Sequence, residues 1–341
     1  MTEKVYEKKS GNGCVVELYF EGRLTHQQLE FLAEMVKKYK IHKTTLNQSG
    51  NLTVWNLRGE ILEEFLADVG KEGIAYGSAY FPRRKRVVCA PLAGIEEGES
   101  FDVFPYAEAA RGWLEQQRDD APFAVYFSNS PLIPKEGKDC NMVFGAVPDG
   151  LFEVWAGVPE GDGCLRGIEE SAYACCQSDE QNEMAGCIGE AETVRKKGII
   201  LFRLAEKVDP GRFLSYIKIG YAIREKAGNA DEYRSLFWQA LAVLSDEERR
   251  PAAVEMSKIT KTGNGNFTCG PRVIKQKQEE LYAVRYHPLG GVVNVAFWHK
   301  LLRSLEKIED VQIRLDSRMN LYVCNLLAEE VGLPMEVTAD G

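Results

Sequence analysis

The seven residues N-L-T-V-W-N-L at positions 51–57 decide how the chain is organised, because they return as N-L-Y-V-C-N-L at positions 320–326. The separation is 269 residues, and the same separation aligns residues 14–57 with 283–326 without a gap. Eight pairs in this frame are identical: Val15/Val284, Gly22/Gly291, Leu46/Leu315, Asn51/Asn320, Leu52/Leu321, Val54/Val323, Asn56/Asn325 and Leu57/Leu326. A solenoid would repeat every ~20–50 residues, so the pattern indicates one duplicated half-domain with a long insertion.

The first copy has the pattern of a ferredoxin-like half-domain. The expected elements are a strand at 14–20, a helix beginning at 25, strands at 44–46 and 52–57, and a helix at 61–69. The first strand is β-branched and aromatic, and Thr25 with Gln28 has the spacing of a capping box. The turn between the paired strands is rich in Asn and Gly. The order β-α-β-β-α is half of a ferredoxin-like arrangement.

The second copy repeats this order near the end of the chain. The expected elements are a strand at 281–288, a helix at 295–305, strands at 312–315 and 321–326, and a closing helix near 326–331. Each copy alone has too few strands to bury an apolar face. We therefore expect an α+β fold in which the two half-domains form one pseudo-twofold sheet.

The insertion between the two copies reads as a further α+β domain. Strands are expected at 87–90 and 123–127, a helix at 104–117, and a hairpin at 142–147 and 151–157 around a Pro-Asp-Gly turn. Helices are expected to dominate from 169 to about 255. The predicted domains are therefore 1–78, 79–262 and 263–341.

Composition limits the classes of partner and the cellular compartment. The net charge is −9 and the isoelectric point about 5.3, which disfavours nucleic acid or an anionic membrane as the main partner. No apolar run reaches the ~18 residues of a membrane-spanning helix, and residues 1–12 lack the apolar core of a secretory signal. The nine cysteines are scattered, which fits reduced thiols in a cytoplasm.

Several motifs together resemble the siroheme-dependent nitrite and sulfite reductases. Residues 22–33 carry the frame G-x-L-T…Q-x-x-x-L-A of that family's half-domain. The second copy is closer still, and the insertion begins with further similar segments. These segments are R-Y-H-P-L-G-G at 285–291, I-R-L-D-S-R-M-N-L at 313–321, V-V-C-A-P-L-A-G at 87–94, F-D-V-F-P at 101–105 and F-S-N-S-P at 127–131. The resemblance covers about residues 14–330, and its order and spacing are more specific than any single motif.

The resemblance implies a fold, cofactors and a reaction. In that family, siroheme lies where three domains meet, and a 4Fe–4S cluster shares a cysteine thiolate with the haem iron. Six electrons pass through this pair to sulfite or nitrite, while arginines and lysines neutralise the anion. A related chain would be an oxidoreductase that binds a small anion and a tetrapyrrole. Its partner would be an electron-donor protein or a separate cluster domain.

The family's positively charged positions are mostly replaced here. Its turn arginine aligns with Ser49, and its pair of lysines aligns with Pro122 and Ala124. The remaining arginine falls within the basic run Arg84-Lys85-Arg86, most closely on Lys85. Arg318 keeps the turn arginine in the second copy. The candidates for binding an anion are therefore Arg84, Lys85, Arg86 and Arg318, although the basic run could equally be a solvated loop.

The cluster-binding cysteines are also missing from the sequence given. The family places them as C-x5-C and C-x3-C beyond the second half-domain, and neither spacing occurs here. The densest cysteines are Cys164, Cys175, Cys176 and Cys187, with ten residues between each outer cysteine and the central pair. Metal sites prefer gaps of about two to four residues, so these four are weak candidates for a metal.

Two interpretations remain open from the sequence. The chain is either the amino-terminal part of a siroheme reductase or a degenerate paralogue that binds a tetrapyrrole, an anion or a partner subunit without catalysis. A shortened reductase explains the missing cluster cysteines but not Ser49, Pro122 and Ala124. A degenerate paralogue explains both. We expect neither siroheme nor the cluster to be bound by this chain alone.

Overall fold

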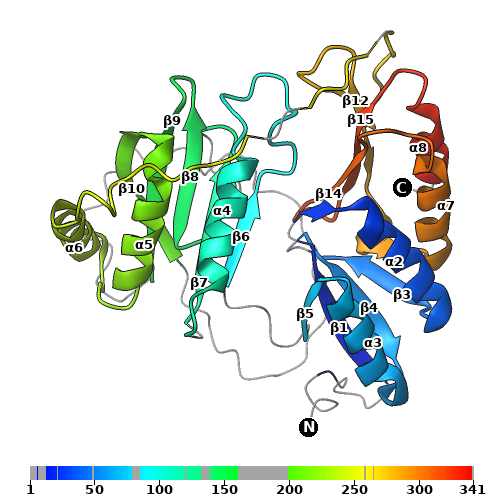
Figure 1. Cartoon of the computed structure of the whole chain (residues 1–341), viewed down its shortest axis with the longest axis horizontal. Coiled ribbons are helices and arrows are strands. Elements are labelled where there is room, and N and C mark those ends of the chain that lie inside the picture. The colour runs from blue at the N-terminus through cyan, green and yellow to red at the C-terminus, as the bar shows by residue number, and fades with distance from the viewer. Residues whose placement is uncertain are drawn as a thin grey trace, which may run out of the picture.

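The computed structural model describes residues 13–20, 22–47, 50–78, 85–119, 121–131, 140–159, 199–256, 259–263 and 265–339, together with Tyr6 and Gly137. These residues form an α+β fold with three five-stranded sheets. The insertion lies on one side of the molecule and the two half-domains on the other (Figure 1). No helix in the described ranges is both long and apolar enough to cross a membrane.

The first half-domain builds a sheet with the strand order β13-β3-β4-β1-β5. Its own elements are β1 (Cys14–Tyr19), β2 (Arg23–Leu24), α2 (His26–Lys38), β3 (Lys43–Leu46), β4 (Leu52–Leu57), α3 (Gly59–Lys71) and β5 (Ala75–Ser78). The predicted capping box is confirmed, because Thr25 and Gln28 each accept a hydrogen bond from the other's backbone amide. This cap fixes the start of α2 immediately after the short strand β2.

The second half-domain builds the sheet β11-β12-β15-β14-β2. Its elements are β11 (Val273–Lys275), β12 (Tyr282–Tyr286), the 3-10 turn η5 (Leu289–Gly291), β13 (Val292–Val293), α7 (Val295–Leu305), β14 (Gln312–Leu315), β15 (Leu321–Leu326) and α8 (Gly332–Val337). The predicted helix at 295–305 and the strands at 312–315 and 321–326 are confirmed. The closing helix was predicted near 326–331, but α8 begins only at Gly332, after a turn.

The two halves exchange their shortest strands, which corrects the prediction of one shared sheet. β2 of the first half pairs with β14 of the second, and β13 of the second half pairs with β3 of the first. Each exchanged strand lies at the edge of the other half's sheet and pairs with one strand only, so two sheets remain. The halves are instead joined by this exchange and by one common core, in which Trp298 Nε1 donates to Thr44 Oγ1 at 3.1 Å.

The ungapped sequence frame is wrong by one residue in the first strand. Val16 pairs with Val54, and Val284 pairs with Val323, so Val16 rather than Val15 is the counterpart of Val284. A shift of one residue moves every side chain to the other face of a sheet. Val16 and Val284 accordingly both lie in the common core.

The two halves carry the same irregularity, near the start of β1 in one and of β12 in the other. The register shifts between Cys14 and Val16 in one half and between Tyr282 and Val284 in the other. Opposite these bulges, Asn56 has φ of 61° and Asn325 has φ of 63°. Asparagine tolerates this left-handed conformation better than most residues, which explains why it occurs at both positions.

The insertion forms the third sheet, with the order β10-β9-β8-β7-β6. Its elements are β6 (Lys85–Cys89), α4 (Phe104–Glu115), β7 (Phe123–Ser128), β8 (Met142–Val147), β9 (Leu151–Pro159), β10 (Ile199–Val208), η4 (Pro210–Arg212), α5 (Phe213–Ile223) and α6 (Ala230–Ala242). The predicted hairpin is confirmed as β8 and β9. The helices pack on one face of this sheet through a second hydrophobic core.

The prediction that helices dominate from 169 to about 255 is confirmed by α5 and α6 but wrong at 199–208, and its part from 169 to 198 lies outside the described residues. Residues 199–208 form the edge strand β10, which pairs with β9. The second half of this strand is bulged, with register shifts between Arg203 and Ala205 and between Ala205 and Val208, and Lys207 has φ of 51°. Bulges and alternating charges protect an edge strand from pairing with other chains, and they also weaken its sequence pattern.

Candidate functional site

The turn that the sequence alignment matches to the reductases' turn arginine has a counterpart in the second half, and the same kind of side chain-to-amide hydrogen bond closes both turns. Asn47 Oδ1 accepts from the amide of Asn51 at 3.1 Å, and Asp316 Oδ1 accepts from the amide of Asn320 at 2.8 Å. Each side chain thereby closes its own five-residue turn between paired strands. Arg318 lies exposed on the second turn, where its backbone amide donates to Asp316. Ser49, at the matching position of the first turn, lies outside the described residues.

Buried polar groups hold the second turn in place. Asp316 Oδ2 accepts from Asn320 Nδ2 at 2.7 Å and from the Tyr322 hydroxyl at 2.8 Å. Burial, reinforced by the Asp316 carboxylate, raises the pKa of Tyr322 far above its usual range. His287 Nδ1 lies 2.9 Å from Asn320 Oδ1 at the edge of this network. The motifs at 285–291 and 313–321 include members of this network, but their hydrogen bonds were not predicted, because the residues are ordinary in strands and turns.

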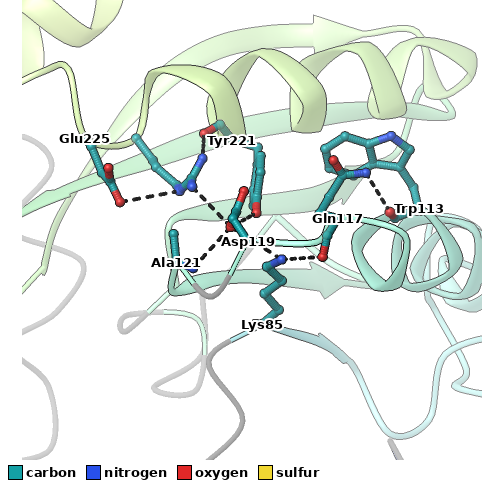
Figure 2. Close-up of polar contacts among 8 residues, drawn as sticks. Lys85, Trp113, Gln117, Asp119, Ala121, Tyr221 and Glu225 are labelled. Atoms are coloured by element: carbon teal, nitrogen blue, oxygen red, sulfur yellow. Dashed lines mark hydrogen bonds and ion pairs between the residues drawn. The ribbon is translucent and has the colours of Figure 1, made fainter.

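Lys85, the basic residue aligned most closely with a family arginine, is held inside the insertion domain. Its side chain is 14% exposed, and Nζ lies 3.4 Å from Asp119 Oδ1. Nζ also donates to the carbonyl oxygen of Gln117 at 2.7 Å and lies 5.6 Å from the centre of the Tyr221 ring. Figure 2 shows these groups converging on Asp119 from β6, from the segment after α4 and from α5.

Asp119 is the centre of this network, which we call the Asp119 cluster: Lys85, Gln117, Asp119, Tyr221 and Arg224. The Tyr221 hydroxyl donates to Asp119, and Arg224 Nη2 lies 3.4 Å from the same carboxylate. The Tyr221 hydrogen bond, more than the neighbouring cations, holds the pKa of Asp119 below its usual value. The positive charge of Lys85 is therefore used to join secondary-structure elements.

The other basic positions fall on the opposite face of the sheet or outside the described residues. β6 and β7 are parallel, and Arg86 pairs with Ala124 across them. Ala124 lies in a small apolar cluster on the face away from the helices, so Arg86 also points to that face. Pro122 is exposed just before β7, and Arg84 lies outside the described residues. The structure thus brings Arg86 and Ala124 together and directs Lys85 away from them.

Two arginines that were not predicted as site residues meet where the insertion contacts the second sheet. Arg23 on β2 and Arg314 on β14 are register partners. The Arg23 guanidinium stacks on Phe104, with 2.9 Å from its carbon to the ring centre. Burial, and then the charge of Arg314, lowers the pKa of Arg23 to about 10. Only the strand exchange brings these residues together, so their sequence positions gave no indication of the pair.

The described cysteines do not fit a 4Fe–4S cluster. Cys14, Cys140 and Cys324 are buried at separate places, Cys89 is partly exposed and Cys269 is exposed. Burial raises the pKa of Cys89 to about 12 and that of Cys324 to about 11, which opposes the thiolate form that a cluster requires. No group of three His, Cys, Asp or Glu side chains in the described ranges could hold a metal ion. Cys164, Cys175, Cys176 and Cys187 lie outside those ranges.

Comparison with known proteins finds a likeness of structure only. No protein-family model matches the chain, and no curated protein gives a significant match. The structure is similar to that of the NirA protein of Mycobacterium tuberculosis, with a TM-score of 0.63 and 13% sequence identity. The match covers 98% of this chain and 59% of the NirA chain. At this identity the likeness concerns the fold, which corresponds to part of the longer protein.

Proposed function

We propose that this chain is a relative of the siroheme-dependent nitrite and sulfite reductases that keeps their scaffold and functions by binding, without reducing sulfite or nitrite itself. The motif order in the sequence and the fold likeness to NirA support the relationship. The ligand under this proposal is a small anion, a tetrapyrrole or a partner subunit. The observation that carries the proposal is the engagement of Lys85 in the Asp119 cluster.

The loss of positive charges argues against reduction of sulfite or nitrite at the place where the reductases bind the anion. Each charge-assisted hydrogen bond to such an anion contributes about 1.5–3 kcal/mol. Ser49, Pro122 and Ala124 replace three of the positive groups, and Lys85 is bound to Gln117 and Asp119 instead. Since about 1.4 kcal/mol corresponds to a tenfold change in rate, these losses together reduce catalysis by several orders of magnitude.

A second candidate function is supported by the length comparison. The chain spans 59% of NirA, so a further polypeptide segment could supply the cluster and complete a reductase. In that case the exposed Arg318 and the face shared by Arg86 and Ala124 would lie nearest to the anion. This alternative requires Lys85 to leave the Asp119 cluster or to take no part in the reaction.

Anaerobic reconstitution distinguishes the two functions. The purified chain would be incubated with siroheme, ferrous iron and sulfide, separated from small molecules and examined by absorption spectroscopy and sulfide analysis. The proposal predicts no stoichiometric cluster in a chain whose circular dichroism shows that it is folded. A siroheme Soret band together with about four acid-labile sulfides per chain would instead support the reductase.

A further inference from the structure

A cavity of about 460 Å³ lies at the outer edge of the insertion, where the end of β10 meets α5 and α6 (Figure 1). This volume is within the ~300–1,000 Å³ of sites that hold small molecules. In the order of the sheet, β10 is the strand farthest from β6, which carries Lys85. The cavity adjoins the first turns of α5, whereas Tyr221 and Arg224 of the Asp119 cluster lie at the other end of that helix. The cavity is therefore separate from the Asp119 cluster.

One side of the cavity is aromatic and firmly anchored. Trp238 on α6 is 43% exposed, and Tyr216 on α5 lines the same cavity. Both rings pack on Phe237, which is completely buried, with ring centres 5.6 Å and 5.1 Å from its own. An indole ring that is held on a helix and open to a cavity offers a flat surface on which a planar group can stack.

Two hydrogen-bond donors of this cavity are not used by the protein. Tyr216 is only 5% exposed, and its hydroxyl makes no hydrogen bond within the described ranges. This hydroxyl is open to the cavity, unlike the unbonded hydroxyl of Tyr233, which is enclosed. The Arg212 guanidinium is exposed and likewise has no ion pair or hydrogen bond in the part of the chain that is described. Burial raises the pKa of Tyr216, and the nearby charge of Arg212 opposes this effect.

The other charges that line the cavity already have partners. Glu206 Oε1 lies 2.8 Å from Arg203 Nη1, and Lys207 Nζ lies 3.3 Å from Asp149 Oδ2. Asp209 Oδ1 accepts from the amide of Gly211 at 2.8 Å, which begins the turn η4. Arg212 is thus the charge left for a ligand, and the carboxylates of Glu206 and Asp209 lie in the same lining. A ligand with one negative charge meets less repulsion from these carboxylates than a ligand with two.

The backbone that carries Arg212 is fixed by the segment after α6. The amide of Ala252 donates to the Gly211 carbonyl at 2.8 Å, and the amide of Arg212 donates to the Asp209 carbonyl at 2.9 Å. A Cβ atom at Gly211 would lie 2.7 Å from Pro251 Cβ, so only glycine allows this close contact. The start of α5 is therefore positioned before any ligand arrives, which lowers the entropic cost of binding.

We propose that this cavity binds a small aromatic carboxylate. The ring stacks on Trp238, and the carboxylate accepts hydrogen bonds from Arg212 and from the Tyr216 hydroxyl. Arginine is suited to this role because its planar guanidinium matches the geometry of a carboxylate. An aliphatic anion would leave the face of Trp238 uncovered, and a neutral ring would leave Arg212 without a partner. The site involves neither Lys85 nor a redox cofactor, so it goes beyond the proposed function and can fail independently of it.

Calorimetric titration of the full chain with phenylacetate and indoleacetate tests this proposal. We expect at least one of them to bind with a Kd below about 1 mM. Acetate, which lacks the ring, and phenylacetamide, which lacks the charge, should bind at least about tenfold more weakly. Phenyl phosphate, which carries a second charge, should bind no more tightly than phenylacetate.

Three variants assign the binding to this cavity. Arg212→Gln and Trp238→Leu should each weaken binding about tenfold. Tyr216→Phe should weaken it about threefold or more, yet leave the melting temperature unchanged, because its hydroxyl has no bond within the described protein to lose. Arg303→Gln is the matched control, since it removes an exposed arginine of α7 in the second half-domain, and affinity should stay within about twofold.

Four results would overturn the proposal. The first is the absence of binding by either aromatic carboxylate to folded wild type. The second is acetate binding as tightly as phenylacetate, which would mean an adventitious ion only. The third is tighter binding of phenyl phosphate, which would assign the cavity to a phosphate ligand. The fourth is unchanged affinity in Arg212→Gln and Trp238→Leu when circular dichroism shows both variants to be folded.

Discussion

Replacing Lys85 with Met should destabilise the insertion domain. Methionine keeps the length and apolar volume of the side chain but removes the ammonium, which donates to Gln117 O at 2.7 Å and lies 3.4 Å from Asp119. A hydrogen bond from a charged donor at a largely buried position contributes about 1.5–3 kcal/mol. The Gln117 carbonyl would also lose its donor. We therefore expect the free energy of unfolding to fall by about 2 kcal/mol.

Urea denaturation followed by tyrosine and tryptophan fluorescence measures this change, because Tyr221 packs edge-on against Trp113 beside the cluster. The matched control is Arg86→Met, the neighbouring cation on the opposite face of β6. Arg86 has no polar contact within the described ranges, so its replacement should cost about 0.5 kcal/mol or less. Equal losses in the two variants, or no loss for Lys85→Met, would refute the assignment of Lys85 to a structural cluster.

Further predictions follow from the same structure. The Tyr221 hydroxyl is the main cause of the lowered pKa of Asp119. The stability that the ionised Asp119 carboxylate contributes is therefore complete above the usual carboxyl pKa of about 3.9, and it is lost as the pH falls through the lowered pKa. The difference in melting temperature between wild type and Asp119→Asn should therefore close below about pH 4, and a constant difference down to pH 2 would contradict this. Gly291→Ala should cost about 2–3 kcal/mol in urea denaturation, because φ is +71° and the new Cβ would lie 2.4 Å from Leu46 O. Gly290→Ala, where φ is +58° and no atom lies within 4 Å, should show only the conformational cost of about 1–2 kcal/mol. Ala124→Lys should destabilise the chain by about 2–4 kcal/mol because it places a charge in an apolar cluster, whereas Pro122→Lys at an exposed position should change stability by about 0.5 kcal/mol or less. Similar effects of the two lysines on the urea midpoint would argue against the buried environment of Ala124.

Local patterns predicted much of the fold. The Thr25 and Gln28 cap, the amphipathic helices and the Asn-rich turns depend on residues close together in the chain, so they can be recognised from a single sequence. Two-residue strands such as β2 and β13 have no detectable pattern, and their exchange between halves depends on tertiary packing. The β10 strand includes Ala205, Glu206 and Lys207, which favour helices, and its pairing with β9 overrides that preference.

The candidate site was less predictable than the fold. The sequence predicted strands at 87–90 and 123–127, with the basic run just before the first, whereas in the structure β6 begins at Lys85 and pairs in parallel with β7, so that Arg86 lies opposite Ala124. Spacing could not show which face each side chain takes, because that depends on strand register. The partners of Lys85 come from the segment after α4 and from α5, and the Arg23–Arg314 pair joins the two halves. Such contacts are set by the folded chain and leave no local signal.

The most direct test of the central claim is sulfite and nitrite reduction by this chain with reduced methyl viologen as electron donor. The assay would use the chain after anaerobic reconstitution, with and without a separately supplied cluster domain, and with protein shown to be folded. Because the proposed alignment puts Ser49, Pro122 and Ala124 at positive positions of the reductases, and Lys85 is held by Gln117 and Asp119, we predict oxidation of the viologen no faster than in a protein-free blank. Turnover at the rate of a working reductase, lost on Lys85→Met in folded protein, would contradict the account and identify Lys85 as a group that binds the substrate.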